Sequence, residues 1–379
     1  MSRLLVQRLQ LFTSWITLFI IGTDLFVVSP LLPLIAEQFG VTPSKAGWMV
    51  TTFSLMYALG APGFGILSDR LGRRKLIVGG LVGFMIANIL TGTASTFNIL
   101  IGSRVLAGIS ASAITSSVFA VTGDSAPEGK SGRWLAIVTT GFLTALWLGA
   151  PIGTVAGKFL GWNYVFIVLG IAAVILLVFN YRMWSTKETA QQKSETNREL
   201  KRILLNVAVT MFWAWSVYGL YTYLGTGLQS VQHLSSILIA VALIVYGIGA
   251  ISGSLLGGRF ADVWTGGSVS TTSLVALGIV LLLLGWLFST WLLWILLAFW
   301  AFSGYVAFSS YQARLAKEFP DNLGSAMAWN QTAMYAGITL GSIFGGWIIN
   351  HWPYTLLPII SGGFAFVAAI WCYRCMKIS

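Results

Sequence analysis

The sequence predicts an all-α membrane protein with twelve transmembrane helices in two pseudo-repeated six-helix halves. Hydrophobic residues make up 56% of the 379 residues and charged residues only 9%, with a mean hydropathy of +0.82. A soluble domain carries about 25% charged residues, so this chain cannot cover itself with a hydrated surface. Its apolar stretches are continuous and about 20 residues long, which indicates spanning helices rather than the alternating strands of a membrane barrel.

Twelve apolar stretches are delimited by prolines, glycines and charged residues. The predicted spans cover residues 9–35, 46–67, 75–95, 98–121, 132–156, 161–183, 203–226, 235–260, 268–288, 290–313, 324–349 and 354–374. The first stretch is too long for the apolar core of a cleaved signal peptide. We therefore expect it to be retained as the first span.

The net charge of +11 is distributed asymmetrically about these spans. With a cytoplasmic N-terminus, only Lys45 and Lys158 fall in outer loops and Arg104 falls within a span, while every other Lys and Arg lies on the cytoplasmic side. The positive-inside rule then predicts an inner (cytoplasmic) membrane protein with both termini in the cytoplasm. The charge is explained without nucleic acid, although it can attract anionic membrane lipid.

A polar stretch, residues 184–202, has the composition of a linker and divides the chain into halves 1–183 and 203–379. A weak internal repeat supports this division, because three residues recur 193 positions later: Gly60, Gly65 and Asp69 as Gly253, Gly258 and Asp262. The pattern indicates a duplication with parallel halves, an arrangement in which transporters handle substrate between the repeats.

Asp24 is the only one of the eleven acidic residues that lies in the body of a predicted span. A carboxylate there costs roughly 2.5–3.5 kcal/mol on insertion scales, so it needs a reason to be present. Burial favours the neutral form and brings proton exchange toward physiological pH, which suits coupling to a proton gradient. The alternative is a structural acid that binds a neighbouring helix.

Arg104 is the only cation within a span. A buried Arg needs a carboxylate, carbonyl groups or a water-filled cavity as its partner. It could lower the proton affinity of a nearby acid or bind an anionic group of a cargo. The alternative is that its side chain reaches the outer interface.

The loop between the second and third spans reads Gly65-Ile-Leu-Ser-Asp69-Arg70-Leu-Gly72-Arg73-Arg74. It resembles the major facilitator superfamily, whose loop signature is Gly-x-x-x-Asp-Arg-x-Gly-Arg-Arg/Lys. The spaced glycines allow close approach and a tight turn. Asp69 can pair with a basic residue or a helix N-terminus across the halves. The resemblance implies a conformational latch formed by this loop together with Arg133 on the next cytoplasmic side.

Two spans resemble proton-coupled exporters of that superfamily. Arg104 and Gly108 resemble a fourth-span signature. Gly149, Pro151 and Gly153 resemble the antiporter signature of the fifth span, which this sequence departs from at Ala150 and at Thr154, where a second glycine is common. Thr23-Asp24-Leu-Phe is similar to the sugar-efflux and arabinose-efflux-like branch of the drug:proton antiporters, many of which carry Glu at that position. The resemblance implies a Gly/Pro-rich helix that bends and packs closely against its neighbour.

Candidate cargo contacts are polar, aromatic or adaptable side chains in the middle of spans: Met56, Trp147, Trp213, Tyr218, Tyr221, Tyr246, Tyr305, Trp329, Asn330, Gln331 and Tyr335. The alternative for each aromatic residue is packing or anchoring. Cys372 and Cys375 read as two small apolar residues one turn apart, because no other ligand cluster accompanies them. No metal, nucleotide or other cofactor motif is present, and no enzymatic activity is expected.

The sequence thus predicts a monomeric secondary transporter that exchanges protons for a small organic molecule, in the export direction and by alternating access. A drug, a sugar or another metabolite is the expected cargo. Proton symport or facilitated uptake is the first alternative. A lipid-handling or non-transporting membrane protein is the second.

Overall fold

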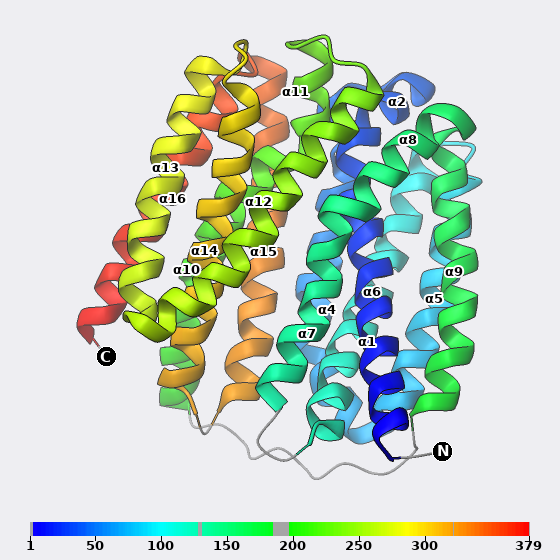
Figure 1. Ribbon diagram of the computed structural model, residues 1–379. Helices are drawn as coiled ribbons and strands as arrows, with labels where there is room; N and C mark the ends of the chain where they lie inside the picture. The colour runs from blue at the N-terminus through cyan, green and yellow to red at the C-terminus, as the bar shows by residue number, and fades with distance from the viewer. Residues whose placement is uncertain (1–2, 128–130, 185–196, 321, 379) are drawn as a thin grey trace. The chain divides into compact units, whose positions relative to one another are not determined.

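The computed structural model describes residues 3–127, 131–184, 197–320 and 322–378, and every regular element within them is a helix (Figure 1). Among the described residues, 11 helices are long and apolar enough to cross a membrane. The predicted second span is occupied by a further helix of 24 residues. The all-α membrane class predicted from the sequence is therefore confirmed.

Contacts divide the chain into two compact units, the first Met1–Val28 with Thr52–Lys193 and the second Ser29–Thr51 with Ser194–Ser379. The first unit contains the helices α1 (Arg3–Phe26), most of α4 (Trp48–Leu71), α5 (Arg73–Gly92), α6 (Phe97–Ser125), α7 (Ser131–Thr144), the π-helix η1 (Ala145–Gly149), α8 (Ala150–Leu160) and α9 (Trp162–Met183). The second unit contains nearly all of α2 (Val28–Phe39), then α3 (Pro43–Ala46), α10 (Asn197–Thr222), α11 (Leu224–Ser230), α12 (Ser236–Val263), α13 (Gly266–Leu287), α14 (Leu293–Glu318), α15 (Leu323–His351) and α16 (Leu356–Ile378).

The predicted first span, residues 9–35, is two helices that meet at Val27. The break has a local cause, because Pro30 has no N–H to donate and its ring clashes with the carbonyl four residues earlier. The Ser29 hydroxyl donates to the backbone carbonyl of Tyr221, which binds the segment after the break to the second unit.

The predicted seventh span, residues 203–226, is also interrupted, at Tyr223. The Tyr223 N–H bonds to Leu220 O, three residues earlier, at 3.1 Å. This tighter turn ends α10. The predicted linker, residues 184–202, contains the start of α10 at Asn197, and its residues 185–196 lie outside the described part of the chain.

Glycines bring the helices of the second unit close together. A Cβ added at Gly249 or Gly253 would lie 2.3 Å from a carbonyl oxygen of α14. Gly219 of α10 and Gly341 of α15 similarly face each other, since a Cβ on Gly341 would lie 2.8 Å from Gly219 Cα. Small residues let spanning helices approach until their backbones touch, which replaces the missing hydrophobic driving force within a membrane.

In the first unit, close contacts of this kind hold α1 against the α7–η1–α8 span. A Cβ on Gly141 would lie 2.3 Å from Trp15 O, and one on Gly153 would lie 2.2 Å from Val27 Cγ2. Gly108 of α6 likewise leaves room for the Phe53 carbonyl of α4, at 2.3 Å from the added Cβ. These contacts set the positions of α1 and α6, which carry the charged residues of the membrane interior.

Candidate functional site

Asp24 of α1 and Arg104 of α6 form a two-pronged ion pair inside the first unit. Arg104 Nη1 donates to Asp24 Oδ1 at 2.9 Å, and Nη2 donates to Oδ2 at 2.7 Å. Both side chains are fully buried, with 0% exposed. Two parallel charge-assisted hydrogen bonds are the strongest and most directional way to pair a guanidinium with a carboxylate. The two charged residues predicted within spans are thus each other's partner.

Aromatic rings surround the guanidinium. The Arg104 Cζ lies 4.9 Å from the ring centroid of Phe53 and 5.6 Å from that of Phe166. The faces of such rings attract cations, so they partly replace the water that Arg104 has lost. Arg104 Nε has no hydrogen-bond partner among the described residues. The guanidinium therefore depends on Asp24 for both of its side-chain hydrogen bonds in this part of the chain.

The span that resembles the antiporter signature, α7–η1–α8, packs against α1 beside this pair. A Cβ on Gly149 would lie 2.2 Å from the Oγ1 of Thr23, the residue that precedes Asp24. The five residues before α8 form the π-helix η1, with Ala150 N–H bonded to Ala145 O. Pro151 explains this local widening, because its ring clashes with the carbonyl four residues earlier in a regular α-helix. Gly149 and Pro151 thus place a wide helical turn next to Asp24.

The stability of this contact depends on the charge of Asp24 and Arg104. While both groups are charged, their attraction holds α1 to α6 at a point where water does not compete. A proton on Asp24 would remove the charge that binds Arg104 and leave a buried cation in need of another acceptor. The contact between α1 and α6 at this point therefore depends on the charge of both side chains.

The second unit contains a buried cluster of aromatic rings. Five of the predicted cargo residues and one further residue, Trp300, line α10, α12 and α14 there: Trp213, Tyr218, Tyr221, Tyr246, Trp300 and Tyr305. The Tyr218 and Tyr305 hydroxyls are 2.8 Å apart and hydrogen-bonded. The ring centroids of Tyr221 and Tyr246 are 5.2 Å apart, and those of Tyr246 and Trp300 are 4.7 Å apart. We call these six residues the aromatic cluster.

The other predicted cargo residues do not belong to this cluster. Asn330 is fully buried on α15 and accepts a hydrogen bond from the Thr210 hydroxyl. Trp329 and Gln331 are half-buried on the same helix, and Tyr335 is buried one turn further. Two more lie in the first unit: Met56, half-buried on α4, and Trp147, half-buried within η1.

The loop of the predicted latch, residues 65–74, is here called the latch loop. Part of it lies outside the described residues. Asp69 and Arg70 lie within α4, but the described part of the chain does not include their side chains. Gly72 has φ +89°, a conformation that glycine adopts at little cost, and it is the N-cap residue directly before α5. No described atom lies within 4 Å of a Cβ added at Gly65, so no close contact requires a glycine there.

The basic residues of the latch loop have partners inside the first unit. The Arg73 guanidinium donates to the Asp124 carboxylate at the end of α6. The Arg74 Cζ lies 3.9 Å from the centroid of the Tyr181 ring of α9. Arg133 is exposed at the start of α7. Asp124 was not singled out from the sequence, where it is one of several acidic residues near span ends.

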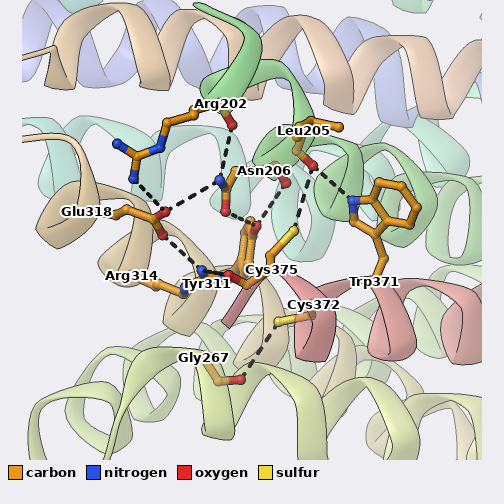
Figure 2. Close-up of polar contacts among 10 residues, drawn as sticks. All are labelled: Arg202, Leu205, Asn206, Gly267, Tyr311, Arg314, Glu318, Trp371, Cys372 and Cys375. Atoms are coloured by element: carbon orange, nitrogen blue, oxygen red, sulfur yellow. Dashed lines mark hydrogen bonds and ion pairs between the residues drawn. The ribbon is translucent and has the colours of Figure 1, made fainter. Parts of the chain in front are cut away.

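A charged network in the second unit escaped the sequence analysis (Figure 2). Glu318 at the end of α14 binds Arg314 Nη2 at 2.9 Å and Arg202 Nη2 of α10 at 3.7 Å. Asn206 Nδ2 lies 3.5 Å from Glu318 Oε1, and the Tyr311 hydroxyl donates to Asn206 O at 2.8 Å. The i, i+4 spacing of Arg314 and Glu318 was the available signal, but it does not reveal α10 as their neighbour.

The same network reaches α16. Arg314 Nη2 donates to Cys375 O at 3.0 Å, and Trp371 Nε1 donates to Leu205 O at 2.9 Å (Figure 2). Cys372 and Cys375 are both buried and unbonded to each other, and no group of three metal-ligating side chains occurs among the described residues. The two thiols lie inside a helix-packing network, and we assign them no ligand.

Comparison with known proteins identifies the family. The model of the Major Facilitator Superfamily matches residues 14–313 and 228–377. The chain belongs to the major facilitator superfamily. Similar relatives include two uncharacterized MFS-type transporters of Bacillus subtilis (strain 168). YceJ is 30% identical over 352 residues, covering 90% of this chain and 89% of the relative. YbcL is 28% identical over 339 residues, covering 88% and 87%.

Solved structures show that the major facilitator fold predicted from the sequence is correct. The chain is similar to the crystal structure of the human organic anion transporter MFSD10 (TETRAN), with a TM-score of 0.72, 16% identity and coverage of 97% and 99% of the two chains. It is also similar to a bacterial homolog of the human lysosomal transporter Spinster, with a TM-score of 0.74, 16% identity and coverage of 97% and 96%. Because the chain belongs to the major facilitator superfamily, it is a multi-pass secondary transporter and not an enzyme.

Proposed function

We propose that this transporter is a proton-coupled antiporter that exports a small organic molecule across the inner membrane by alternating access, as a monomer with both termini in the cytoplasm. The observation that supports it most is the buried Asp24–Arg104 pair, with both side chains 0% exposed and joined by two hydrogen bonds. A membrane acid of this kind marks a proton or ion pathway by default.

In the proposed cycle, the proton and Arg104 compete for Asp24. A proton that enters from the outside neutralises Asp24, releases Arg104 and loosens α1 from α6. This favours release of cargo outside and the return of the binding site to the inside. Loss of the proton to the cytoplasm re-forms the pair and prepares the protein for loading. The π-helix beside Thr23 gives α1 a neighbour whose backbone can adjust to this movement.

The experiment that tests the proposal is proton flux in proteoliposomes challenged with a panel of sugars, nucleosides and cationic drugs. Asp24→Asn keeps the size of the side chain and removes its titration. We expect cargo-driven proton movement in the wild type, its loss in Asp24→Asn and its retention in Asp24→Glu. Glu37→Gln is the matched control, because Glu37 is an exposed carboxylate on α2.

The alternatives correspond to distinct outcomes. Cargo that moves equally in the wild type and in Asp24→Asn without proton flux identifies a facilitative carrier, and Asp24 is then a structural acid. Protons that move in the same direction as cargo identify a symporter. The absence of transport of any soluble cargo, with uptake of a fluorescent lipid analogue, identifies a lipid-handling protein.

The latch loop has a separate role in this proposal. Arg73 and Arg74 have partners within the first unit, Asp124 and Tyr181. We therefore assign the latch contact to Asp69, the acidic residue of the signature. We expect Asp69→Ala to be expressed at the wild-type level and to transport at least about tenfold more slowly, because one conformational state loses a charge-assisted contact. Asp262→Ala is the control, since Asp262 is an exposed residue at the repeat position. Unchanged turnover in Asp69→Ala would remove the latch from the mechanism.

A further inference from the structure

We propose that the aromatic cluster binds an uncharged ring compound and that the indole N–H of Trp300 donates a hydrogen bond to an oxygen of that compound. This inference rests on the proposed transport function and names the class of cargo. The oxygen belongs to a hydroxyl, an ether or a carbonyl group. Glycosides and nucleosides have this chemistry, whereas organic cations without an acceptor oxygen do not.

Trp300 has a buried hydrogen-bond donor without an acceptor among the described residues. Its side chain is 0% exposed, and Nε1 has no hydrogen-bond acceptor among the described residues. The other indole of the cluster is satisfied, because Trp213 Nε1 donates to Gly304 O at 2.7 Å. An indole nitrogen can only donate, and a buried one usually finds an acceptor. Trp300 therefore lacks an acceptor that a bound molecule can supply.

The aromatic cluster connects two tightly packed helix pairs. Glycines bring α12 against α14 and α10 against α15 until their backbones nearly touch. By contrast, the backbones of α10 and α14 approach each other at few places. Rings of the aromatic cluster meet across this seam, where the centroids of Trp213 on α10 and Tyr305 on α14 lie 5.8 Å apart. In the proposed bound state the rings on α10 part from those on α14, which breaks the Tyr218–Tyr305 hydrogen bond but leaves the glycine contacts of both close-packed pairs in place, and a flat molecule stacks between the rings.

The aromatic cluster contains no charged side chain. In the described part of the second unit, every acidic or basic residue lies near the end of a helix or in a segment that connects two helices. None of them belongs to the aromatic cluster. A carboxylate would lose water there without gaining a counter-ion. A cation could use the ring faces but would leave the Trp300 N–H unmet. A neutral ring with an acceptor oxygen satisfies both the rings and the donor.

The test measures equilibrium binding to the full chain in lipid nanodiscs, with empty nanodiscs as the blank and no glycoside detergent. The probe is phenyl β-D-glucopyranoside, compared with tetraphenylphosphonium as a cation and benzoate as an anion. Trp300→Phe keeps a ring and removes the donor, so we expect about five- to tenfold weaker binding of the glucoside. Trp286→Phe removes an indole that is 81% exposed and should leave binding within about twofold.

If Trp300→Phe is unstable, the proposal is tested by comparing the binding of two ligands to the wild type. Cyclohexylbenzene has a similar two-ring outline without any oxygen, and we expect its saturable binding to be at least about fivefold weaker. The proposal is overturned if the glucoside does not bind the wild type, if Trp300→Phe binds it as well as the wild type does, or if the cation or anion binds as tightly.

The two proposals can fail separately. Binding is measured without a proton gradient, so a protein that binds the glucoside through Trp300 but shows no proton flux contradicts only the antiport mechanism. Normal proton coupling with unchanged binding in Trp300→Phe contradicts only the assignment of the cargo site.

Discussion

At corresponding positions of their spans, the first unit has charged side chains and the second unit has apolar ones. Asp24 lies three residues before the helix break at Val27, and Leu220 lies three residues before the break at Tyr223. Leu297 follows Arg104 by the 193-residue repeat interval. Both leucines are 0% exposed. The first unit therefore has an ion pair where the second has apolar packing.

We infer from this difference that the fold itself does not require the ion pair. Leucines occupy the corresponding places of the same kind of helix, and apolar residues can replace a buried ion pair with little effect on stability. In the second unit, the charged network around Glu318 lies at the ends of α10 and α14, while the middle of the unit holds the aromatic cluster. We infer that the pair in the first unit is kept for its charge chemistry.

The largest effect is expected from breaking the pair on one side only. Arg104→Leu leaves the Asp24 carboxylate buried without a partner, so we expect a loss of about 3–5 kcal/mol in the free energy of unfolding and no proton coupling. The double variant Asp24→Leu/Arg104→Leu imitates the second unit and should return to within about 1 kcal/mol of the wild type while coupling stays absent. Unfolding in nanodiscs and proton flux measure the two effects. A double variant that is less stable than Arg104→Leu would show that the pair is structural.

A smaller effect is expected at the contact between α1 and the π-helix. Gly149→Ala places a methyl group 2.2 Å from Thr23 Oγ1 and should cost about 1–3 kcal/mol of unfolding free energy through overpacking. Gly258→Ala is the matched control in the second unit, because no described atom lies within 4 Å of its added Cβ. The two thermal unfolding curves are compared directly. Adding Thr23→Ala should recover part of the loss, and equal curves for both glycine variants would contradict the close packing.

The smallest effect is expected from the charged network of the second unit. Glu318→Gln removes the charge that Arg314 and Arg202 share, at a position where the carboxylate side chain is 10% exposed. We expect a loss of about 1–2 kcal/mol of unfolding free energy with proton coupling intact. Chemical denaturation and proton flux test this, with Glu37→Gln as the exposed control. Loss of coupling in Glu318→Gln would place titratable function in both units.

Periodicity and composition were enough to predict the class of fold, because a membrane restricts spanning segments to long apolar helices. They were not enough to predict where a span is broken. The break at Val27 follows from Pro30, which was visible, but the break at Tyr223 depends on a local turn without proline or glycine. The π-helix before Pro151 is also a local adjustment that apolar patterning does not record.

The candidate site could be predicted residue by residue but not as a set of contacts. Asp24 and Arg104 stand out because charge is rare within spans, yet their separation in the sequence says nothing about their distance in space. The predicted aromatic residues gathered only in part, and Trp300 was missed because its sequence context is as apolar as that of any packing residue. The Glu318 network was missed because charges near span ends are common.

The sequence by itself determined that this chain is a helical membrane transporter with one acid and one base in its interior, since a bilayer penalises each charge enough to make it conspicuous. Only the tertiary structure decided that the two bind each other, that glycines bring α1 against a π-helix beside them, and that six rings gather in the second unit. Such contacts join residues that are far apart along the chain, and their distance depends on how whole helices pack.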